Sequence, residues 1–332
     1  MSQRDGWVTR CRESQSYAAG VVRTLVLASP RGYCAGVERA VETVEQALAL
    51  HGAPVYVRRQ IVHNAHVVRE LEQRGAIFVE SEEDAPRGAV LVLSAHGVAP
   101  AVRDRSAARR QQMIDATCPL VAKVHAAARR YATEGYTVLL VGHAGHEEVE
   151  GTLGEAPEAT ILVETSADAE RVEVADPERV AYVTQTTLSV DETAEIVETL
   201  RRRFPAIEGP DEGDICYATT NRQRAVKELA AEVDVMLVIG SENSSNSNRL
   251  VEAARAAGVE AHLIEDETAI DERWLAGAET VGLTSGASAP ERLVTHVCMW
   301  FRERGVHEIR SAGAVVENVF FRLPVEVRAP AA

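Results

Sequence analysis

Three copies of one pattern, each led by a cysteine, constrain how this chain can fold. In each copy a short apolar segment ends at the cysteine, and then come an amphipathic helical pattern, an apolar strand and a polar loop. The leading cysteines are Cys34, Cys118 and Cys216. The polar loops follow 28 or 29 residues later, at His63, His146 and Ser244. A repeat of a whole α/β unit predicts three similar α/β lobes in a pseudo-threefold arrangement.

Each copy also has a second polar loop, which follows a later apolar strand. These loops lie 62, 68 and 72 residues after the leading cysteines and contain His96, Thr186 and Ser288. Because α/β folds bind ligands at the carboxyl ends of parallel strands, we expect the three cysteines and six polar loops to face one central cavity. Cysteine is also a common core residue, but the matched distances and flanking elements favour a shared site.

The order of these patterns divides the chain into five predicted parts. They are an N-terminal extension (1–20, with Cys11), lobe 1 (21–110), lobe 2 (111–210), lobe 3 (211–310) and a C-terminal tail (311–332). The tail is apolar enough at 315–321 to pack back on the body. The acidic stretch 80–87 contains a proline and is interpreted as a surface connection.

Composition narrows the classes of function. The 332 residues can form two or three cores, and the net charge of −15 argues against nucleic acid and anionic membranes as partners. No apolar run approaches the roughly 18 residues that a membrane helix needs, and the chain does not open with the apolar stretch of a signal peptide. We therefore expect a cytoplasmic protein. The five cysteines are scattered and do not resemble a disulfide framework.

Three equivalent cysteines point to a metal group rather than to a nucleophile. A cysteine nucleophile needs one thiol with a base, and structural zinc sites usually show C-x-x-C pairs, which this chain lacks. Thiolates also hold iron–sulfur clusters. Three of them would leave one iron of a [4Fe–4S] cluster without a protein ligand, open to act as a Lewis acid. Cys298 lies in an apolar helical stretch and is interpreted as a core residue.

The polar loops carry short donors that are typical of a phosphate or diphosphate site. Histidine, hydroxyl and amide groups can all direct hydrogen bonds at anionic oxygens. The candidate residues are His63, His96, His146, Thr186, Ser244, Ser245, Asn246 and Ser288. Any one of these histidines alone would be interpreted as a surface or core residue. Glu148 has the most obvious acid–base role, whereas the adjacent Glu147 is interpreted as solvated.

An ordered set of motifs resembles the 4-hydroxy-3-methylbut-2-enyl diphosphate reductases of the non-mevalonate isoprenoid pathway. With their flanks these motifs cover residues 21–322. They include P-R-G-Y-C-A-G-V at Pro30, S-A-H-G-V at Ser94, D-A-T-C-P-L-V at Asp115, G-H-A-G-H-E-E-V-E-G at Gly142, T-Q-T-T-L-S at Thr184, C-Y-A-T-T-N-R-Q at Cys216 and N-S-S-N-S-N-R-L at Asn243. The chain departs from the family pattern at its N-terminal extension and at Glu147, where many members carry proline.

This resemblance implies a [4Fe–4S] cluster on Cys34, Cys118 and Cys216, which can be found as [3Fe–4S] after exposure to oxygen. It implies that the substrate hydroxyl binds the open iron, that the diphosphate lies among the histidines, the serines and Asn246 with Thr186 nearby, and that Glu148 is the proton donor. The implied products are isopentenyl and dimethylallyl diphosphate.

The source of electrons is a further expectation. The chain has no flavin or nicotinamide fingerprint, so we expect a ferredoxin or flavodoxin to supply two electrons, one at a time. Two alternatives remain open from the sequence alone. One is a zinc-dependent diphosphate hydrolase, and the other is a cluster-bearing sensor without turnover.

Overall fold

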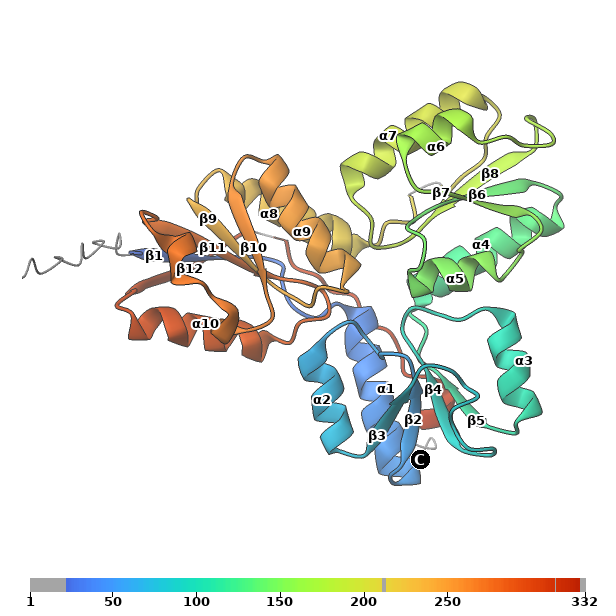
Figure 1. Cartoon of the computed structure of the whole chain (residues 1–332), viewed down its shortest axis with the longest axis horizontal. Helices are drawn as coiled ribbons and strands as arrows, with labels where there is room; N and C mark the ends of the chain where they lie inside the picture. The colour runs from blue at the N-terminus through green and yellow to red at the C-terminus, as the bar shows by residue number, and fades with distance from the viewer. Residues whose placement is uncertain (1–21, 211–212, 314, 329–332) are drawn as a thin grey trace, which may run out of the picture.

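A computed structural model describes residues 22–210, 213–313 and 315–328 (Figure 1). Three α/β lobes surround a common centre, and each is built on its own parallel sheet. The predicted fold class is confirmed. The predicted extension at 1–20, with Cys11, lies outside the described residues.

The three sheets differ in their number of strands and in strand order. Lobe 1 has the order β3-β2-β4-β5, with β2 Val55–Arg58, β3 Ala76–Val79, β4 Val90–Leu93 and β5 Gln112–Asp115. Lobe 2 has the order β7-β6-β8, with β6 Thr137–Val141, β7 Thr160–Val163 and β8 Val180–Thr184. Lobe 3 has the order β10-β9-β11-β1-β12, with β1 Thr24–Ala28, β9 Val235–Ile239, β10 Glu260–Ile264, β11 Thr280–Ser285 and β12 Glu308–Ala312.

Helices cover both faces of every sheet (Figure 1). Lobe 1 has α1 Ala35–His51, α2 Ala65–Gln73 and α3 Pro100–Ala108. Lobe 2 has α4 Pro119–Thr133, α5 Glu147–Leu153, α6 Ser166–Arg171 and α7 Val190–Arg203. Lobe 3 has α8 Tyr217–Ala230, α9 Ser245–Ala256, α10 Glu291–Glu303 and the 3₁₀ helices η1 Glu267–Ala269 and η2 Glu272–Leu275, and the tail ends in η3 Val325–Val327.

Alternating side chains of the central strands supply a core on each face. In β9, Val235, Leu237 and Ile239 belong to one hydrophobic cluster, and Met236 and Val238 belong to the other. All five are buried. A strand buried on both faces reads as one continuous apolar run, which is typical of parallel sheets covered by helices.

The strand before each cysteine belongs to a different lobe from the helix after it. Strand β1 pairs with β11 and β12 in lobe 3, and β5 pairs with β4 in lobe 1. Glu208, upstream of Cys216, likewise forms a parallel bridge with Ala181 of β8 in lobe 2. The predicted boundaries therefore assign β1 and β5 to the wrong lobes. Local sequence shows that a strand exists, but the sheet that it joins depends on long-range pairing.

The tail connects lobe 3 to lobe 1. After β12 it crosses to lobe 1, where Leu323 and Val327 pack against the hydrophobic cluster that contains residues of α1 and α2 (Figure 1). Within the apolar run predicted to pack on the body, Val316 and Phe320 are instead 77% and 78% exposed.

The acidic connection at 80–87 contains one buried carboxylate. Glu82 is fully buried and forms ion pairs with Arg58, at 2.9 Å, and with Arg105. Burial raises the pKa of Glu82, but hydrogen bonds from its own backbone, Arg105 and Arg58 outweigh burial and hold that pKa below its usual value. The surface interpretation is therefore wrong at this position, because the run of acidic residues gives no sign that one of them faces inward.

We predict that Glu82→Gln lowers the free energy of unfolding at pH 7 by about 3 kcal/mol, because it leaves Arg58 without a charged partner. The depressed pKa of folded Glu82 means that its contribution is complete above the unfolded value of about 4.3 and is lost as the pH falls through the folded value. The difference should therefore shrink on acidification.

Urea unfolding at several pH values measures this difference. The exposed neighbour Glu83 provides the control, and Glu83→Gln should change stability by less than about 0.5 kcal/mol. Equal effects of the two substitutions at pH 7 would contradict the assigned role of Glu82.

Candidate active site

Each of the three cysteines lies immediately before a helix. Cys34 is the N-cap of α1, Cys118 of α4 and Cys216 of α8. The first N–H groups of a helix have no partner within it, so its N-terminus carries partial positive charge and favours a thiolate. Cys216 shows this directly, since its sulfur accepts a hydrogen bond from the backbone N–H of Thr219 at 3.4 Å.

The second polar loops hold the backbone of the cysteines. The N–H of each cysteine donates to a carbonyl in one of these loops: Cys34 to Ala287 at 3.3 Å, Cys118 to Ala95 at 2.9 Å and Cys216 to Thr186 at 3.0 Å. The loop that holds a cysteine always belongs to the lobe whose sheet contains the strand or bridge before it. Each cysteine thus joins two lobes. The same backbone hydrogen bond occurs at all three cysteines, as the approximate threefold symmetry predicts.

The three sulfurs share one cavity. Its lining includes the three cysteines, His96, Glu148 and Thr186, together with the apolar side chains of Val37, Leu120, Val121, Ala287 and Phe321. A Cβ atom at Gly36 would lie 2.7 Å from the Cys118 sulfur and 3.8 Å from the Cys34 sulfur, so both approach the same point on α1.

Burial in this cavity opposes free thiolates. It raises the pKa of Cys118 to about 12 and that of Cys216 to about 11, and the neighbouring Cys34 acts in the same direction. The sulfurs would therefore become thiolates only with a compensating cation bound to them. Soft sulfur ligands in dry surroundings suit an iron–sulfur group better than a hydrated hard ion.

Three histidines form a second cluster beside this cavity. The rings of His63 and His96 stack with centroids 4.1 Å apart, and His146 meets them edge-on at 5.6 and 5.8 Å. Burial lowers the pKa of His63 and His146 to about 3 and that of His96 to about 4. At neutral pH each ring is therefore neutral, and each can take up a proton when an anion binds.

The remaining candidate residues link the polar loops to one another. Ser288 Oγ donates to the carbonyl of His63 at 2.9 Å, and Ser245 Oγ donates to the carbonyl of Thr187 at 3.2 Å. Ser244 caps α9, and its Oγ accepts from the N–H of Ser247 at 3.3 Å. The structure thus places Ser288 and Ser245 in contact with loops from other parts of the site, whereas Ser244 caps its own helix.

Asn246 connects the loop that contains Ala287 and Ser288 to the start of α8, beside Cys216. Its Oδ1 accepts from the N–H of Ala287 at 2.9 Å, and its Nδ2 donates to Thr219 Oγ1 at 3.2 Å. That hydroxyl lies 3.2 Å from the Cys216 sulfur. Sequence reasoning missed Thr219, although the C-Y-A-T-T-N-R-Q motif contains it.

Glu148 is a buried acid in the cavity of the cysteines. The backbone N–H of Thr186 donates to its Oε1 at 2.6 Å, and Thr186 Oγ1 donates to its Oε2 at 3.1 Å. Burial raises the pKa of Glu148 to about 7, and the hydrogen bonds from Thr186 offset part of that effect. Near neutral pH, Glu148 can therefore both hold and release a proton.

Glu147 is not solvated, contrary to the interpretation of the sequence. Its side chain is only 13% exposed, accepts a hydrogen bond from Ser94 Oγ at 3.3 Å and lies 3.4 Å from His96 Nδ1. The reason is that α5 begins at Glu147, and the first turn of the helix directs this carboxylate toward the histidines. A carboxylate thus lies beside groups that are otherwise suited to an anion.

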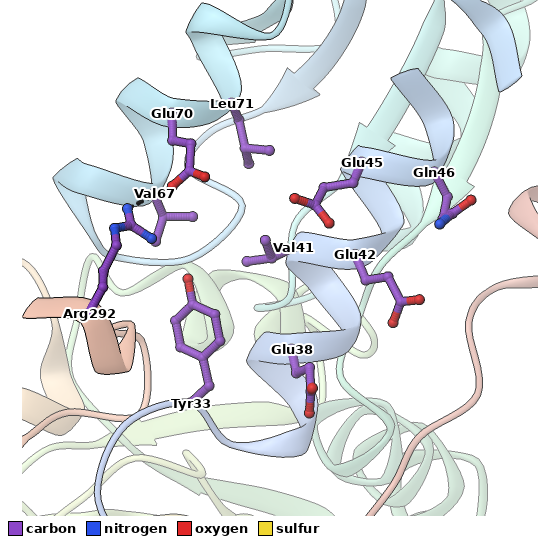
Figure 2. Close-up of a pocket in the computed structure, with 10 residues that line it drawn as sticks. All are labelled: Tyr33, Glu38, Val41, Glu42, Glu45, Gln46, Val67, Glu70, Leu71 and Arg292. Atoms are coloured by element: carbon purple, nitrogen blue, oxygen red, sulfur yellow. Dashed lines mark ion pairs between the residues drawn. The ribbon is translucent and has the colours of Figure 1, made fainter. Parts of the chain in front are cut away.

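A separate groove between α1, α2 and α10 has several acidic side chains in its lining (Figure 2). Its lining includes the carboxylates of Glu38, Glu42, Glu45 and Glu70, and Arg292 pairs with Glu70 at 2.6 Å. Because this acidic lining repels anions, the groove is unsuited to a diphosphate. The histidine cluster is the better site.

Comparisons with known proteins identify the family of this chain. A protein-family model described as LytB protein matches residues 25–302. The chain is 59% identical to a 4-hydroxy-3-methylbut-2-enyl diphosphate reductase of Acidothermus cellulolyticus over 307 residues, which cover 92% of this chain and 90% of the relative. It is 52% identical to the enzyme of the same name from Nocardia farcinica, over 97% of this chain and 96% of the relative.

Two solved structures of reductases are also similar to this chain. The structure of the E-1-hydroxy-2-methyl-but-2-enyl-4-diphosphate reductase from Plasmodium falciparum superposes with a TM-score of 0.89 and 39% identity, over 92% of this chain and 97% of that one. A second reductase structure, titled the terminal enzyme of the non-mevalonate pathway, has a TM-score of 0.61 and 33% identity, over 85% of this chain and 100% of that one.

We predict that Gly36→Ala lowers the iron content of anaerobically purified protein, because the new methyl group would displace the Cys118 sulfur. In an ordinary helix this substitution stabilises by about 1 kcal/mol. Loss of iron with an unchanged circular dichroism spectrum would therefore show that the helix is intact and that the methyl group acts by its clash with the sulfur. Full iron content would show that the sulfur does not need this space.

We predict that Glu147→Gln strengthens the binding of inorganic diphosphate by roughly fivefold at pH 7, because it removes a negative charge beside the anion. Isothermal titration calorimetry measures the affinity. Glu158→Gln makes the same change in net charge at an exposed position and should leave the affinity unchanged. Weaker binding by the Glu147 variant would show that the carboxylate supports the site instead.

Proposed function

The chain belongs to the LytB family of 4-hydroxy-3-methylbut-2-enyl diphosphate reductases, and we propose that the residues around its three cysteines carry out the family's reaction. It is an oxidoreductase of the non-mevalonate isoprenoid pathway and acts on a small diphosphate. A zinc-dependent hydrolase and a sensor without turnover are not supported, because the relatives that match nearly the whole chain are named as reductases.

The observation that carries the assignment of residues is the convergence of three helix N-caps, each a cysteine, on a cavity that also contains Glu148. The family depends on iron and sulfur, and we assign a [4Fe–4S] cluster to Cys34, Cys118 and Cys216. When bound, such a cluster would supply single electrons and a Lewis-acidic iron that lacks a protein ligand.

The polar loops are assigned to the diphosphate. The neutral histidines can accept protons as the anion binds, and α2 and α9 present helix N-termini in the same loops. The assigned residues are His63, His96, His146, Ser244, Ser245, Asn246 and Ser288. Thr186 lies nearby, where both of its donors hold Glu148. Binding by several loops at once would fix the position of the allylic alcohol before any bond breaks.

Glu148 is assigned the role of the acid. Replacing the hydroxyl by hydrogen consumes two electrons and two protons and releases water. Hydroxide is a poor leaving group, so a proton must reach the departing oxygen. With a pKa of about 7, Glu148 can donate this proton near neutral pH, and Thr186 then stabilises the carboxylate by two hydrogen bonds.

We assign the supply of electrons to a ferredoxin or flavodoxin. A cytoplasmic location, where thiols stay reduced, suits the free cysteines. In the parts of the chain that the structure describes, no helix combines the length and the apolar composition required to span a membrane.

Serine substitutions test the three-cysteine assignment. We predict that Cys34→Ser, Cys118→Ser and Cys216→Ser each remove most of the iron from anaerobically purified protein. Cys298→Ser should retain it, because Cys298 packs against the hydrophobic core of lobe 3. Iron and sulfide analysis gives the answer, and a fully loaded Cys118→Ser protein would rule out the assignment.

The proton-donor assignment predicts that Glu148→Gln lowers the rate by roughly 10²–10⁴-fold, because the amide keeps the size but cannot donate the proton. Substrate affinity should change little. Since the donor must be protonated, the wild-type rate should fall as the pH rises through about 7, and the residual rate of the variant should lack this decline.

Anaerobic stopped-flow measurement of single turnovers across the pH range tests the role of Glu148. The exposed Glu158→Gln serves as the control for the change in charge. A Glu148→Gln variant with near-wild-type turnover, or with the wild-type pH profile, would remove Glu148 from the role of acid.

A further inference from the structure

Residues 317–322 of the tail, named here the strap, cross the outside of the cysteine cavity. They lie between β12 of lobe 3 and the residues that pack on lobe 1. Phe321 lines the cavity together with Cys34, Cys118 and Cys216, whereas the adjacent Phe320 is 78% exposed. One strap residue thus faces the cysteines and its neighbour faces solvent.

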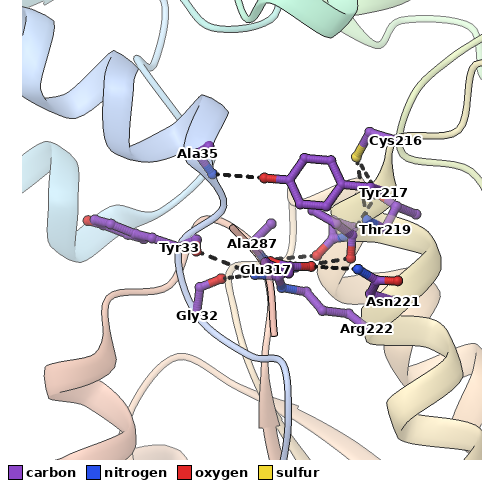
Figure 3. A network of polar contacts seen from close by, with 12 residues as sticks. Gly32, Tyr33, Ala35, Cys216, Tyr217, Thr219, Asn221, Arg222, Ala287 and Glu317 are labelled. Atoms are coloured by element: carbon purple, nitrogen blue, oxygen red, sulfur yellow. Dashed lines mark hydrogen bonds and ion pairs between the residues drawn. The ribbon is translucent and has the colours of Figure 1, made fainter. Parts of the chain in front are cut away.

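The first anchor of the strap is Arg222, a fully buried residue of α8 (Figure 3). Its Nη1 donates to the two carboxylate oxygens of Glu317 at 3.1 and 3.2 Å and to the carbonyl of Ala218 at 3.0 Å. Its Nη2 donates to the carbonyl of Gly32 at 2.7 Å. Gly32 is two residues before Cys34, and Ala218 is two residues after Cys216, so one guanidinium connects the strap to two cysteine segments.

The second anchor is Arg39 of α1. Its Nε donates to the carbonyl of Arg322 at 2.8 Å, at the other end of the strap. Its Nη1 and Nη2 donate to the carbonyls of Thr117 at 3.0 Å and Asp115 at 3.3 Å, directly before Cys118. The two arginines therefore connect the strap to all three cysteine segments.

Because Arg222 is buried and charged, its position depends on its ion pair with Glu317 of the strap. An arginine that is fully removed from water needs a paired anion, and removing one partner of such a pair is strongly destabilising. Glu317 supplies that anion and also accepts from Asn221 Nδ2 at 3.0 Å. Attachment of the strap and the position of Arg222 are therefore coupled, and Arg222 in turn holds the Cys34 loop.

We propose that the strap closes the cluster cavity, and that Arg222 and Arg39 are positioning residues that couple this closure to the placement of the three cysteines. Closure by Phe321 shields the sulfurs from solvent and slows the loss of iron. This inference rests on the proposed cluster on Cys34, Cys118 and Cys216.

The test compares iron release from the anaerobically purified, cluster-loaded full chain after addition of a ferrous chelator. We expect Phe321→Ala and Glu317→Gln to release iron about tenfold faster than wild type, because each weakens the closed state. Two exposed side chains provide matched controls. Phe320→Ala alters an exposed ring of the tail and Glu303→Gln an exposed carboxylate of α10, and both should stay within about twofold of wild type.

Hydrogen exchange at the amides of β9 in the same samples reports on opening of the whole protein, because every residue of this strand is buried in the core of lobe 3. Faster iron release with unchanged exchange in β9 supports the strap. Wild-type release rates in Phe321→Ala and Glu317→Gln, equal acceleration by Phe320→Ala, or a parallel rise in the exchange of β9 would overturn it. Failure of wild-type protein to hold a cluster would instead contradict the proposed function.

Discussion

The structure depends on the meeting of three helix N-termini that each begin with a cysteine. The strand or bridge before each cysteine belongs to one lobe and the helix after it to the next, so each lobe holds two of the three cysteines and none holds all three. Hydrogen bonds between lobes, such as that from the Cys34 N–H to the carbonyl of Ala287, help to set the relative positions of the sulfurs. Packing between the lobes therefore determines the geometry of the site.

Burial sets the charge of the site before any ligand arrives. It raises the pKa of Cys118 and Glu148 and lowers that of His63 and His96, so acids and bases alike are pushed toward their neutral forms. Helix N-termini add local positive potential. A chain with a net charge of −15 can in this way offer a local site for an anion, and Glu148 can keep a proton that an exposed carboxyl would lose.

The sequence predicted those parts of the site that follow from position along the chain. The repeat marked Cys118 and His146, because equivalent lobes place equivalent residues at equal spacing. It could not assign β1 to lobe 3, since that depends on pairing with strands more than 250 residues away. It likewise misplaced Glu82 and Glu147, because an acidic residue in a polar run looks solvated until the direction of its side chain is known.

The arginines near the cysteines follow from the irregular backbone of the cysteine loops. Loops that bring sulfur into a shared cavity cannot pair all their carbonyls within a helix or sheet, and buried carbonyls need donors. A guanidinium offers five N–H donors in a fixed plane, whereas an ammonium offers three from one point. Arg222 and Arg39 use this geometry to bind carbonyls from segments far apart in the chain. Lysine would keep the charge at either position but could not reach the same set of acceptors, so the planar shape of arginine, as well as its charge, is what the cysteine loops require.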